Sequence, residues 1–428
     1  MMKEYLSVKR GNMKRKRRKK LKYKNILLLV GIIVLIVVIS KNIAKKEEKE
    51  IITADVIDSY VGKKIDELDE LSKKENITIN KTYKYDKDIA KDLIISTNFN
   101  NQKVDVVISK GMPDESIYRE KKVNELGKVP IMMYHGIIDT EETNYIGGNV
   151  DKNGYNRKVG SFREDLEFYY KSGYRMIRLN DYINGIIDVE LGYSPLILTF
   201  DDGDKNNFNV LGKNDDGSLN IDPNCAIGVL EEFKKKYPDF GVTATFFVMD
   251  GIFNQSSYNQ EILNWLVEHG YDVGNHTTIH PDFTTITTAK TQEVVGKMYQ
   301  KLDDLLGDKY VKIVALPYGS PYKKDHANYQ YIMKGEYNGY SYETEAALRV
   351  GWEPEVSPFN KDFDKEFLKR CRAYDNNGKE FDIEMVFKNL ENTRYISDGD
   401  KDLVVIREKD QSKLNTSYTN VIIYKESD

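Results

Sequence analysis

The chain has 428 residues, of which 40% are hydrophobic and 31% are charged, so it can form roughly two or three folded domains and is not a wholly disordered protein. The net charge of −4 hides an asymmetry, because residues 1–25 carry +11 and the rest of the chain carries −15. This acidic main body disfavours binding to nucleic acid.

The first predicted element is a membrane-spanning helix over residues 26–40, an uncharged Ile/Val/Leu run without proline. A buried core helix is disfavoured because the run has no polar face, and a cleaved signal peptide because no small-residue cleavage signature follows. Residues 1–25 are strongly basic, so the positive-inside rule predicts a cytoplasmic tail. We therefore expect a single-pass signal anchor with the remainder of the chain outside the cytoplasm.

Residues 52–111 predict a small α+β module with a short strand, a helix and two or three further strands. The phrases Val61-Gly62-Lys63 and Val106–Gly111 resemble the PASTA module of bacterial cell-wall proteins, although Asn98–Gln102 replaces the usual Pro-x-Gly. The resemblance implies either a spacer or a binder of wall fragments. A hydrophilic linker is expected over residues 112–128.

From residue 129 to 428 the pattern predicts an α/β domain, because apolar runs alternate with amphipathic stretches. The expected strands are 130–134, 175–179, 196–200, 244–248, 272–274, 312–316 and 403–406, and the expected helices are 162–171, 225–236, 260–268 and 291–306. Catalytic groups in such folds gather at the carboxyl ends of strands. Polar residues that follow these runs are therefore the candidates for a site.

Two of the strand ends carry residues suited to a metal ion. Asp201 and Asp202 follow the run 196–200, and adjacent carboxylates diverge at a strand end, so one can bind a metal while the other acts as a base. His276 and His280 are four residues apart, which predicts both imidazoles on one face of a helical turn. Two imidazoles and one carboxylate leave coordination positions open, as in catalytic sites. We expect one divalent ion, with zinc favoured and cobalt or nickel as alternatives.

Four motifs in this order resemble the polysaccharide deacetylases of the NodB-homology type, the fourth carbohydrate esterase family. They are Thr199–Gly203, Ala244–Val248, Gly274–Pro281 and Pro317–Gly319. The resemblance implies a distorted (β/α) barrel and a metal-dependent hydrolase that removes N-acetyl groups from a glycan. In residue terms it implies that the metal ligands are Asp202, His276 and His280, the general base is Asp201, and the backbone N–H of Tyr318, after Pro317, faces the oxyanion.

Two residues usual in that family are absent here. The arginine that orients the base is replaced by Ala315, and the candidates to replace it are Arg349, Arg370, Arg372 and Arg394. A late histidine that supplies the general acid is also missing, because no histidine follows His326. His135, in Pro130–Gly136, is the predicted replacement, since the first and last strands of a closed barrel are neighbours. An exopolysaccharide-active branch of the family resembles this Tyr-His-Gly-Ile pattern.

The expected substrate is an N-acetylated glycan outside a bacterial cell membrane, with peptidoglycan N-acetylglucosamine favoured by the wall-type module. The alternatives are secreted poly-N-acetylglucosamine, an O-acetyl ester, or no substrate at all in an inactive glycan-binding wall protein. Tyr318, Tyr322 and Trp352 are candidates to contact sugar faces. The sequence does not identify a partner protein and leaves open whether Cys225 and Cys371 pair.

Overall fold

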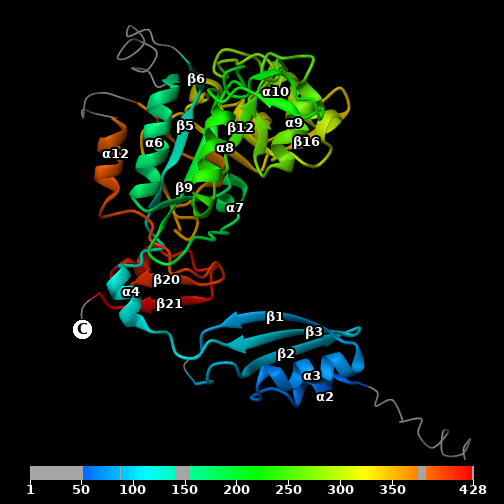
Figure 1. Cartoon of the computed structure of the whole chain (residues 1–428), viewed down its shortest axis with the longest axis vertical. Coiled ribbons are helices and arrows are strands. Elements are labelled where there is room, and N and C mark those ends of the chain that lie inside the picture. The colour runs from blue at the N-terminus through cyan, green and yellow to red at the C-terminus, as the bar shows by residue number, and fades with distance from the viewer. Residues whose placement is uncertain (1–51, 87, 140–154, 375–381, 427–428) are drawn as a thin grey trace, which may run out of the picture. The chain divides into compact units, whose positions relative to one another are not determined.

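The computed structural model describes residues 52–86, 88–139, 155–374 and 382–426, which fall into two compact units, 1–113 and 114–428 (Figure 1). The predicted membrane segment 26–40 and the basic tail before it lie outside the described residues. Within the described ranges, every helix is too short or too polar to cross a bilayer.

The first unit packs two helices on a three-stranded sheet. Its elements are α2 (Ala54–Asp58), α3 (Ile65–Glu75), β1 (Thr78–Lys84), β2 (Ile94–Asn100) and β3 (Lys103–Ser109). The sheet order is β1-β3-β2, with β1 and β3 parallel and β2 and β3 antiparallel. Ile57, Leu68, Val104 and Val106 are fully buried in its core. The predicted opening strand is wrong, because α2 occupies that place, and the PASTA resemblance stays a prediction.

Residues 114–128 belong to the second unit, which differs from the linker predicted over 112–128. They contain α4 (Glu115–Lys121) and the start of β4 (Lys128–Val129). Tyr118 and Val123 are buried, and the Asn124 N–H donates to the carbonyl of Ile396. A few apolar residues therefore fix a segment whose composition is otherwise that of a linker.

The second unit is built on a parallel sheet in the order β17-β14-β13-β12-β9-β5-β19, with β8 also paired to β9. The strands are β5 (Ile131–Tyr134), β8 (Tyr174–Met176), β9 (Ser194–Phe200), β12 (Thr245–Val248), β13 (Asp272–Asn275), β14 (Ile313–Ala315), β17 (Ala346–Leu348) and β19 (Cys371–Arg372). All seven residues of β9 are buried, as expected for a central strand covered on both faces. The α/β architecture with a curled parallel sheet agrees with the sequence.

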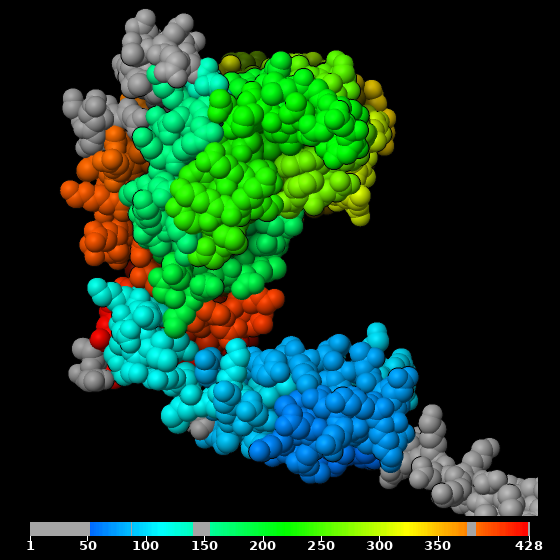
Figure 2. Space-filling model, in the orientation of Figure 1, coloured from blue at the N-terminus to red at the C-terminus, as the bar shows by residue number. Residues whose placement is uncertain are grey.

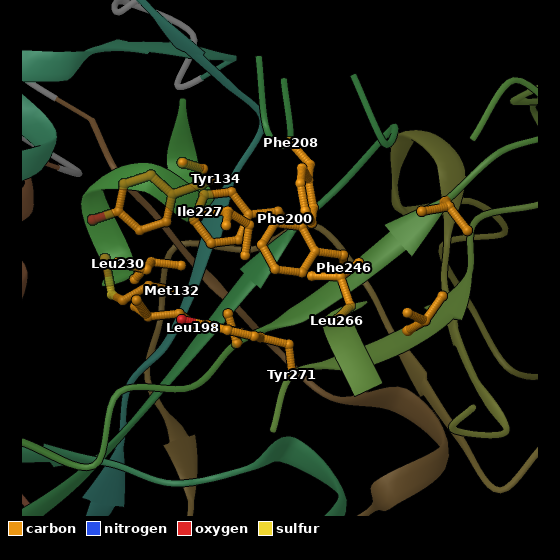
Figure 3. Packing of buried hydrophobic residues seen from close by; sticks show 14 of the residues in the cluster. Met132, Tyr134, Leu198, Phe200, Phe208, Ile227, Leu230, Phe246, Leu266 and Tyr271 are labelled. Carbon is orange, nitrogen blue, oxygen red and sulfur yellow. The ribbon is translucent and has the colours of Figure 1, made fainter. Parts of the chain in front are cut away.

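Two hydrophobic clusters cover the faces of this sheet. On one face, Phe200 of β9 lies between the rings of Tyr134 and Phe246, at centroid distances of 5.4 and 4.9 Å, within a cluster completed by helices (Figure 3). Ile131, Ile197, Phe247 and Ile313 face the other cluster. Alternate residues of each strand thus enter opposite cores, which fixes the strand register.

The helices around this sheet are α6 (Val159–Lys171), α7 (Leu179–Ile183), α8 (Ala226–Lys236), α9 (Asn259–Glu268), α10 (Thr288–Leu306), α11 (Tyr329–Met333) and α12 (Ile383–Leu390). All of them except α7 pack on the first of these clusters, and the buried residues of α7 belong to the second. In α6, Phe162, Leu166 and Tyr169 recur at helical spacing and are buried. Figures 1 and 2 show α12 (orange) beside α6, where the rings of Phe387 and Phe168 lie 5.3 Å apart. The strand predicted over 175–179 ends at Met176, because α7 begins at Leu179.

The two edges of the sheet are joined by residues 368–372. Leu368 forms a parallel bridge with Leu348 of β17, and Cys371 in β19 pairs with Met132 of β5. The last predicted strand, 403–406, is not part of this sheet, because β20 (Val404–Arg407) pairs with β21 (Val421–Tyr424). The first strand of the sheet, β5, therefore lies between β9 and β19, and not beside residues 403–406.

The remaining elements are short strands and 3₁₀ turns outside the parallel sheet. They are β6 (Gly136–Ile138), β7 (Asn156–Lys158), β10 (Val210–Lys213), β11 (Leu219–Ile221), β15 (Lys334–Tyr337), β16 (Tyr340–Glu343), β18 (Glu355–Val356), and the 3₁₀ turns η2 (Pro238–Phe240), η3 (Pro317–Gly319), η4 (Lys365–Phe367) and η5 (Glu408–Lys413). Cys225 and Cys371 are buried free thiols, so they do not pair.

Candidate functional site

The carboxyl ends of β9 and β13 bring an aspartate and two histidines together. Asp202 Oδ1 lies 3.2 Å from His276 Nε2 and 3.6 Å from His280 Nε2. One ligand atom from each of the three side chains lies within 4.8 Å of the others. Metal bonds of roughly 2.0–2.2 Å place two ligand atoms of a tetrahedral zinc ion roughly 3.3 Å apart, so these spacings suit such an ion.

Tight turns, rather than a helix, position these ligands. The predicted helical turn at 276–280 is wrong, because Thr277 and His280 have left-handed φ angles of 65° and 50°. The Thr277 N–H donates to Asn275 Oδ1, and the His280 N–H donates to Thr277 Oγ1. Asp202 also has a positive φ, of 71°, in the turn after β9. The two histidines are thus positioned by side-chain hydrogen bonds and left-handed residues, and not by the regular spacing of a helix.

The hydrogen bonding of His276 prepares its other ring nitrogen to bind a metal. Nδ1 lies 2.8 Å from the carbonyl of Ala315, which can only accept, so Nδ1 carries the proton. Nε2 is then a bare acceptor, and it is buried with no hydrogen-bond partner among the described residues. An orphaned, buried nitrogen that faces a carboxylate fits a metal ligand with an outer carbonyl partner.

The charges around this cluster also favour a cation. Burial alone would lower the pKa of His276, but the carboxylates of Asp201 and Asp202 outweigh it and raise that pKa. Burial and the neighbouring His276 lower the pKa of His280, which favours its neutral form. The cluster therefore combines negative potential with a neutral imidazole, the properties that a divalent ion requires.

Asp201 is held by Arg370, one of the four arginines proposed from the sequence. Nη1 and Nη2 of Arg370 donate 2.7 Å hydrogen bonds to Oδ1 and Oδ2 of Asp201, and both side chains are buried. Burial would raise the pKa of Asp201, but the Arg370 guanidinium outweighs it and lowers that pKa below its ordinary value. Asp201 is thus a fixed, ionised carboxylate beside the metal cluster.

The guanidinium of Arg370 is itself fixed by neighbouring strands. Nε donates to the carbonyl of Arg349, and Nη1 also donates to Thr199 Oγ1 at 3.2 Å. Among the alternatives, Arg394 donates to the carbonyl of Ser172, and Arg372 stacks on Trp352. No spacing rule ranks Arg370 first, because its selection depends on how residues 368–372 join the two sheet edges.

His135, directly after β5, also lies next to Asp201. Its Nε2 is 4.0 Å from Asp201 Oδ2, and its Nδ1 is buried with no hydrogen-bond partner in the described part of the chain. Burial lowers the pKa of His135 from its ordinary value, despite the nearby carboxylates. The lowered pKa favours the neutral form of His135, the residue predicted to be the general acid.

The predicted substrate-side residues lie beside the cluster. The ring of Tyr318, in η3, is 4.4 Å from that of His280, and it is 57% exposed, whereas Pro317 is buried. Tyr318 and Trp352 line one groove of about 390 Å³. The role expected for the Tyr318 N–H stays a prediction. His269 stacks on Trp265 and lies outside the site.

Residues 189–333 match the family model described as polysaccharide deacetylase. The chain therefore carries a polysaccharide deacetylase domain. The matched part of this domain includes Asp201, Asp202, His276, His280 and Tyr318, whereas His135 and Arg370 lie outside it. The family match therefore does not include His135 and Arg370, two residues that lie next to the Asp201 carboxylate.

The solved structures that are similar to the chain include two deacetylases. One is a deacetylase from Streptococcus pyogenes in complex with acetate, with 18% identity over 62% of this chain and 98% of that one, and a TM-score of 0.44. The other is a de-N-acetylase from Aggregatibacter actinomycetemcomitans, with 12% identity over 61% of this chain and 99% of that one, and a TM-score of 0.40.

Proposed function

We propose that the deacetylase domain removes N-acetyl groups from N-acetylglucosamine in peptidoglycan and that it requires one divalent ion, with zinc favoured. The observation that carries this proposal is the Asp202, His276 and His280 cluster beside an Asp201 carboxylate that Arg370 keeps ionised. When bound there, a divalent ion supplies Lewis-acid chemistry, which polarises an acyl oxygen and makes water more acidic.

In this proposal Asp201 removes a proton from the attacking water and His135 delivers one to the leaving nitrogen. The Arg370 guanidinium lowers the pKa of Asp201, which favours release of a proton that Asp201 has taken from water, and His135 is the neighbouring group that receives it. The 4.0 Å between Oδ2 and Nε2 leaves only a small movement for that transfer. His135 can therefore start neutral and still act as the acid for an amide, whose nitrogen leaves poorly unless it is protonated.

The proposed oxyanion donor is the backbone N–H of Tyr318. Tyr318 has a left-handed φ of 57° in η3, next to His280. A preorganised N–H at this position would stabilise charge that develops only in the transition state. The ring of Tyr318 then faces the sugar.

The proposed location is the outer surface of a bacterial cell membrane, anchored through residues 26–40. This part of the proposal rests on the basic residues before that apolar run and on the positive-inside rule. An anchored enzyme reaches a glycan close to the membrane, which favours peptidoglycan over a secreted polymer. The PASTA-like module, if it binds wall fragments, would add to this preference.

The absence of the family's arginine and late histidine favours the alternative of an inactive glycan-binding wall protein. Arg370 hydrogen-bonds to Asp201 and His135 lies 4.0 Å from it, and this arrangement favours an active enzyme. An O-acetyl esterase would use the same metal residues, and the requirement for His135 distinguishes it from an amidase.

The test is acetate release by the full-length chain from peptidoglycan, chitooligosaccharide and poly-N-acetylglucosamine, with and without a chelator. We expect release from peptidoglycan that the chelator abolishes and added zinc restores. Release from none of the three glycans by zinc-loaded protein would refute the deacetylase proposal. Faster release from poly-N-acetylglucosamine would refute the proposed substrate alone.

A further inference from the structure

A groove next to the metal cluster is lined by aromatic rings and cations. Its aromatic members are Tyr318, Tyr322 and Trp352, whose exposed fractions are 57%, 58% and 43%. Large aromatic side chains that are this exposed in one groove are available to pack on sugar faces. The groove is therefore the natural continuation of the substrate site.

The groove touches the catalytic residues on two sides. Tyr318 lies against His280, with ring centroids 4.4 Å apart. On the other side, the Arg372 guanidinium is 5.9 Å from the centroid of the Tyr155 ring, which is 5.3 Å from that of His135. The groove therefore adjoins the metal cluster through Tyr318 and approaches His135 through the Tyr155 ring.

Three cations line the groove: Arg349, Lys369 and Arg372. Arg349 follows β17, and Arg372 ends β19, so both come from the carboxyl ends of strands, where such folds place substrate-binding groups. Lys369 is paired with Glu353 at 3.3 Å, which offsets its charge. The described lining residues comprise three cations and one acid, Glu353, so their net charge is positive, in a chain that carries −15 after residue 25.

Aromatic contacts hold the two guanidinium groups in place. Arg349 lies 5.1 Å from the Phe367 ring centroid, and Arg372 lies 4.7 Å from that of Trp352. Nε of Arg349 is buried with no hydrogen-bond acceptor among the residues that the structure describes. Burial, and to a lesser extent the nearby Arg370, lowers the pKa of Arg372. A planar guanidinium that is fixed in this way is preorganised for a carboxylate or phosphate.

We infer that this groove binds a negatively charged group of the glycan, a carboxylate or a phosphodiester, close to the acetylated sugar. The inference rests on the proposed function and names its substrate class. Arg349 and Arg372 pair with the anion, while Tyr318 and Trp352 pack on neighbouring sugars. Peptidoglycan carries such carboxylates on its stem peptides, and on muramic acid where the stem peptide has been removed, whereas poly-N-acetylglucosamine has none.

The experiment compares three substrates of similar length with the zinc-loaded, full-length chain. One is neutral chitotetraose, one is a peptidoglycan strand with free muramic acid carboxylates, and one is an N-acetylglucosamine oligomer that carries a phosphodiester. We expect kcat/KM to be at least about tenfold higher on an anionic substrate, mainly through KM, as one or two charge-assisted hydrogen bonds would give. The preference should shrink as salt rises. The better of the two anionic substrates identifies the anion.

Variants test the assignment to the two arginines. In R349Q/R372Q the ratio of anionic to neutral kcat/KM should fall towards one, while R349K/R372K should keep a ratio above one. Arg163→Gln is the matched control. Arg163, on α6, pairs with Glu232 of α8 and is not part of the groove, so this variant should leave the ratio unchanged.

Three outcomes would overturn the inference. Equal kcat/KM on the neutral and anionic substrates by the wild-type chain would do so without any variant. A ratio that R349Q/R372Q leaves intact would also do so. Acetate release from none of the three substrates would refute the proposed function itself, and the anion site with it, so the two failures are distinguishable.

Discussion

Arg370 donates two 2.7 Å hydrogen bonds to the two carboxylate oxygens of Asp201, and neither side chain reaches solvent. The arginine comes from the segment that joins the two edges of the sheet, whereas the expected position, residue 315, is an alanine. Position 315 contributes through its backbone instead, because its carbonyl accepts from His276. The site thus obtains its base and its metal ligands from one curled sheet.

Removing Arg370 should destabilise the domain. Arg370→Met leaves the Asp201 carboxylate buried without its partner, which typically costs about 3–5 kcal/mol of unfolding free energy. Because the folded-state pKa of Asp201 is depressed, the pair stabilises above the ordinary carboxyl pKa and loses this effect as pH falls below about 4. Denaturant unfolding at several pH values measures the difference.

The matched control for this prediction is the double variant R370M/D201N. It removes the buried charge along with its partner, so it should recover part of the lost stability. If the two residues act independently, the unfolding free energy of R370M/D201N will be lower than that of R370M by the full amount that Asp201→Asn costs on its own.

The pH profile of activity should shift in the same variant. Without the guanidinium, burial dominates and the pKa of Asp201 rises, so more of the base is protonated at a given acidic pH. The acidic limb of kcat/KM for acetate release should therefore move to higher pH. Arg370→Lys keeps a positive charge and should shift it less. An acidic limb that stays at the wild-type pH in Arg370→Met would mean that Arg370 does not control this base.

His135→Ala should separate amide from ester hydrolysis. General acid catalysis contributes about a hundredfold to ten-thousandfold, so kcat on an N-acetylated glycan should fall by about that factor. An aryl acetate, whose leaving group needs little protonation, should be affected far less. His269→Ala is the control, because His269 stacks on Trp265 outside the site. Similar losses on both substrates would argue against His135 as the acid.

Phe200 should be important for stability because it is buried between two rings directly before Asp201. Phe200→Ala empties that space, and large-to-small changes of this kind cost about 3–5 kcal/mol. Phe168→Ala should cost much less, because Phe168 is 39% exposed. Thermal or urea unfolding compares the two, and equal losses would contradict the packing described here.

The sequence predicted the parts of the site that are local in the chain. Asp201 and Asp202 follow a strand whose apolar run is unmistakable, and His276 and His280 follow another. It gave Arg370 only as one of four candidate arginines, because β19 is two residues long and its pairing beside β5 depends on tertiary structure. The turn at Thr277 was missed because its left-handed backbone is held by the Asn275 side chain, which no periodicity reveals.

The most direct test of the account is the metal content of the purified full-length chain, measured together with acetate release from peptidoglycan. We predict one zinc or cobalt ion bound per wild-type chain, loss of the ion in Asp202→Ala and His276→Ala, and acetate release that stops on chelation and returns with zinc. A chelated, metal-free protein that releases acetate at the wild-type rate would contradict the central claim.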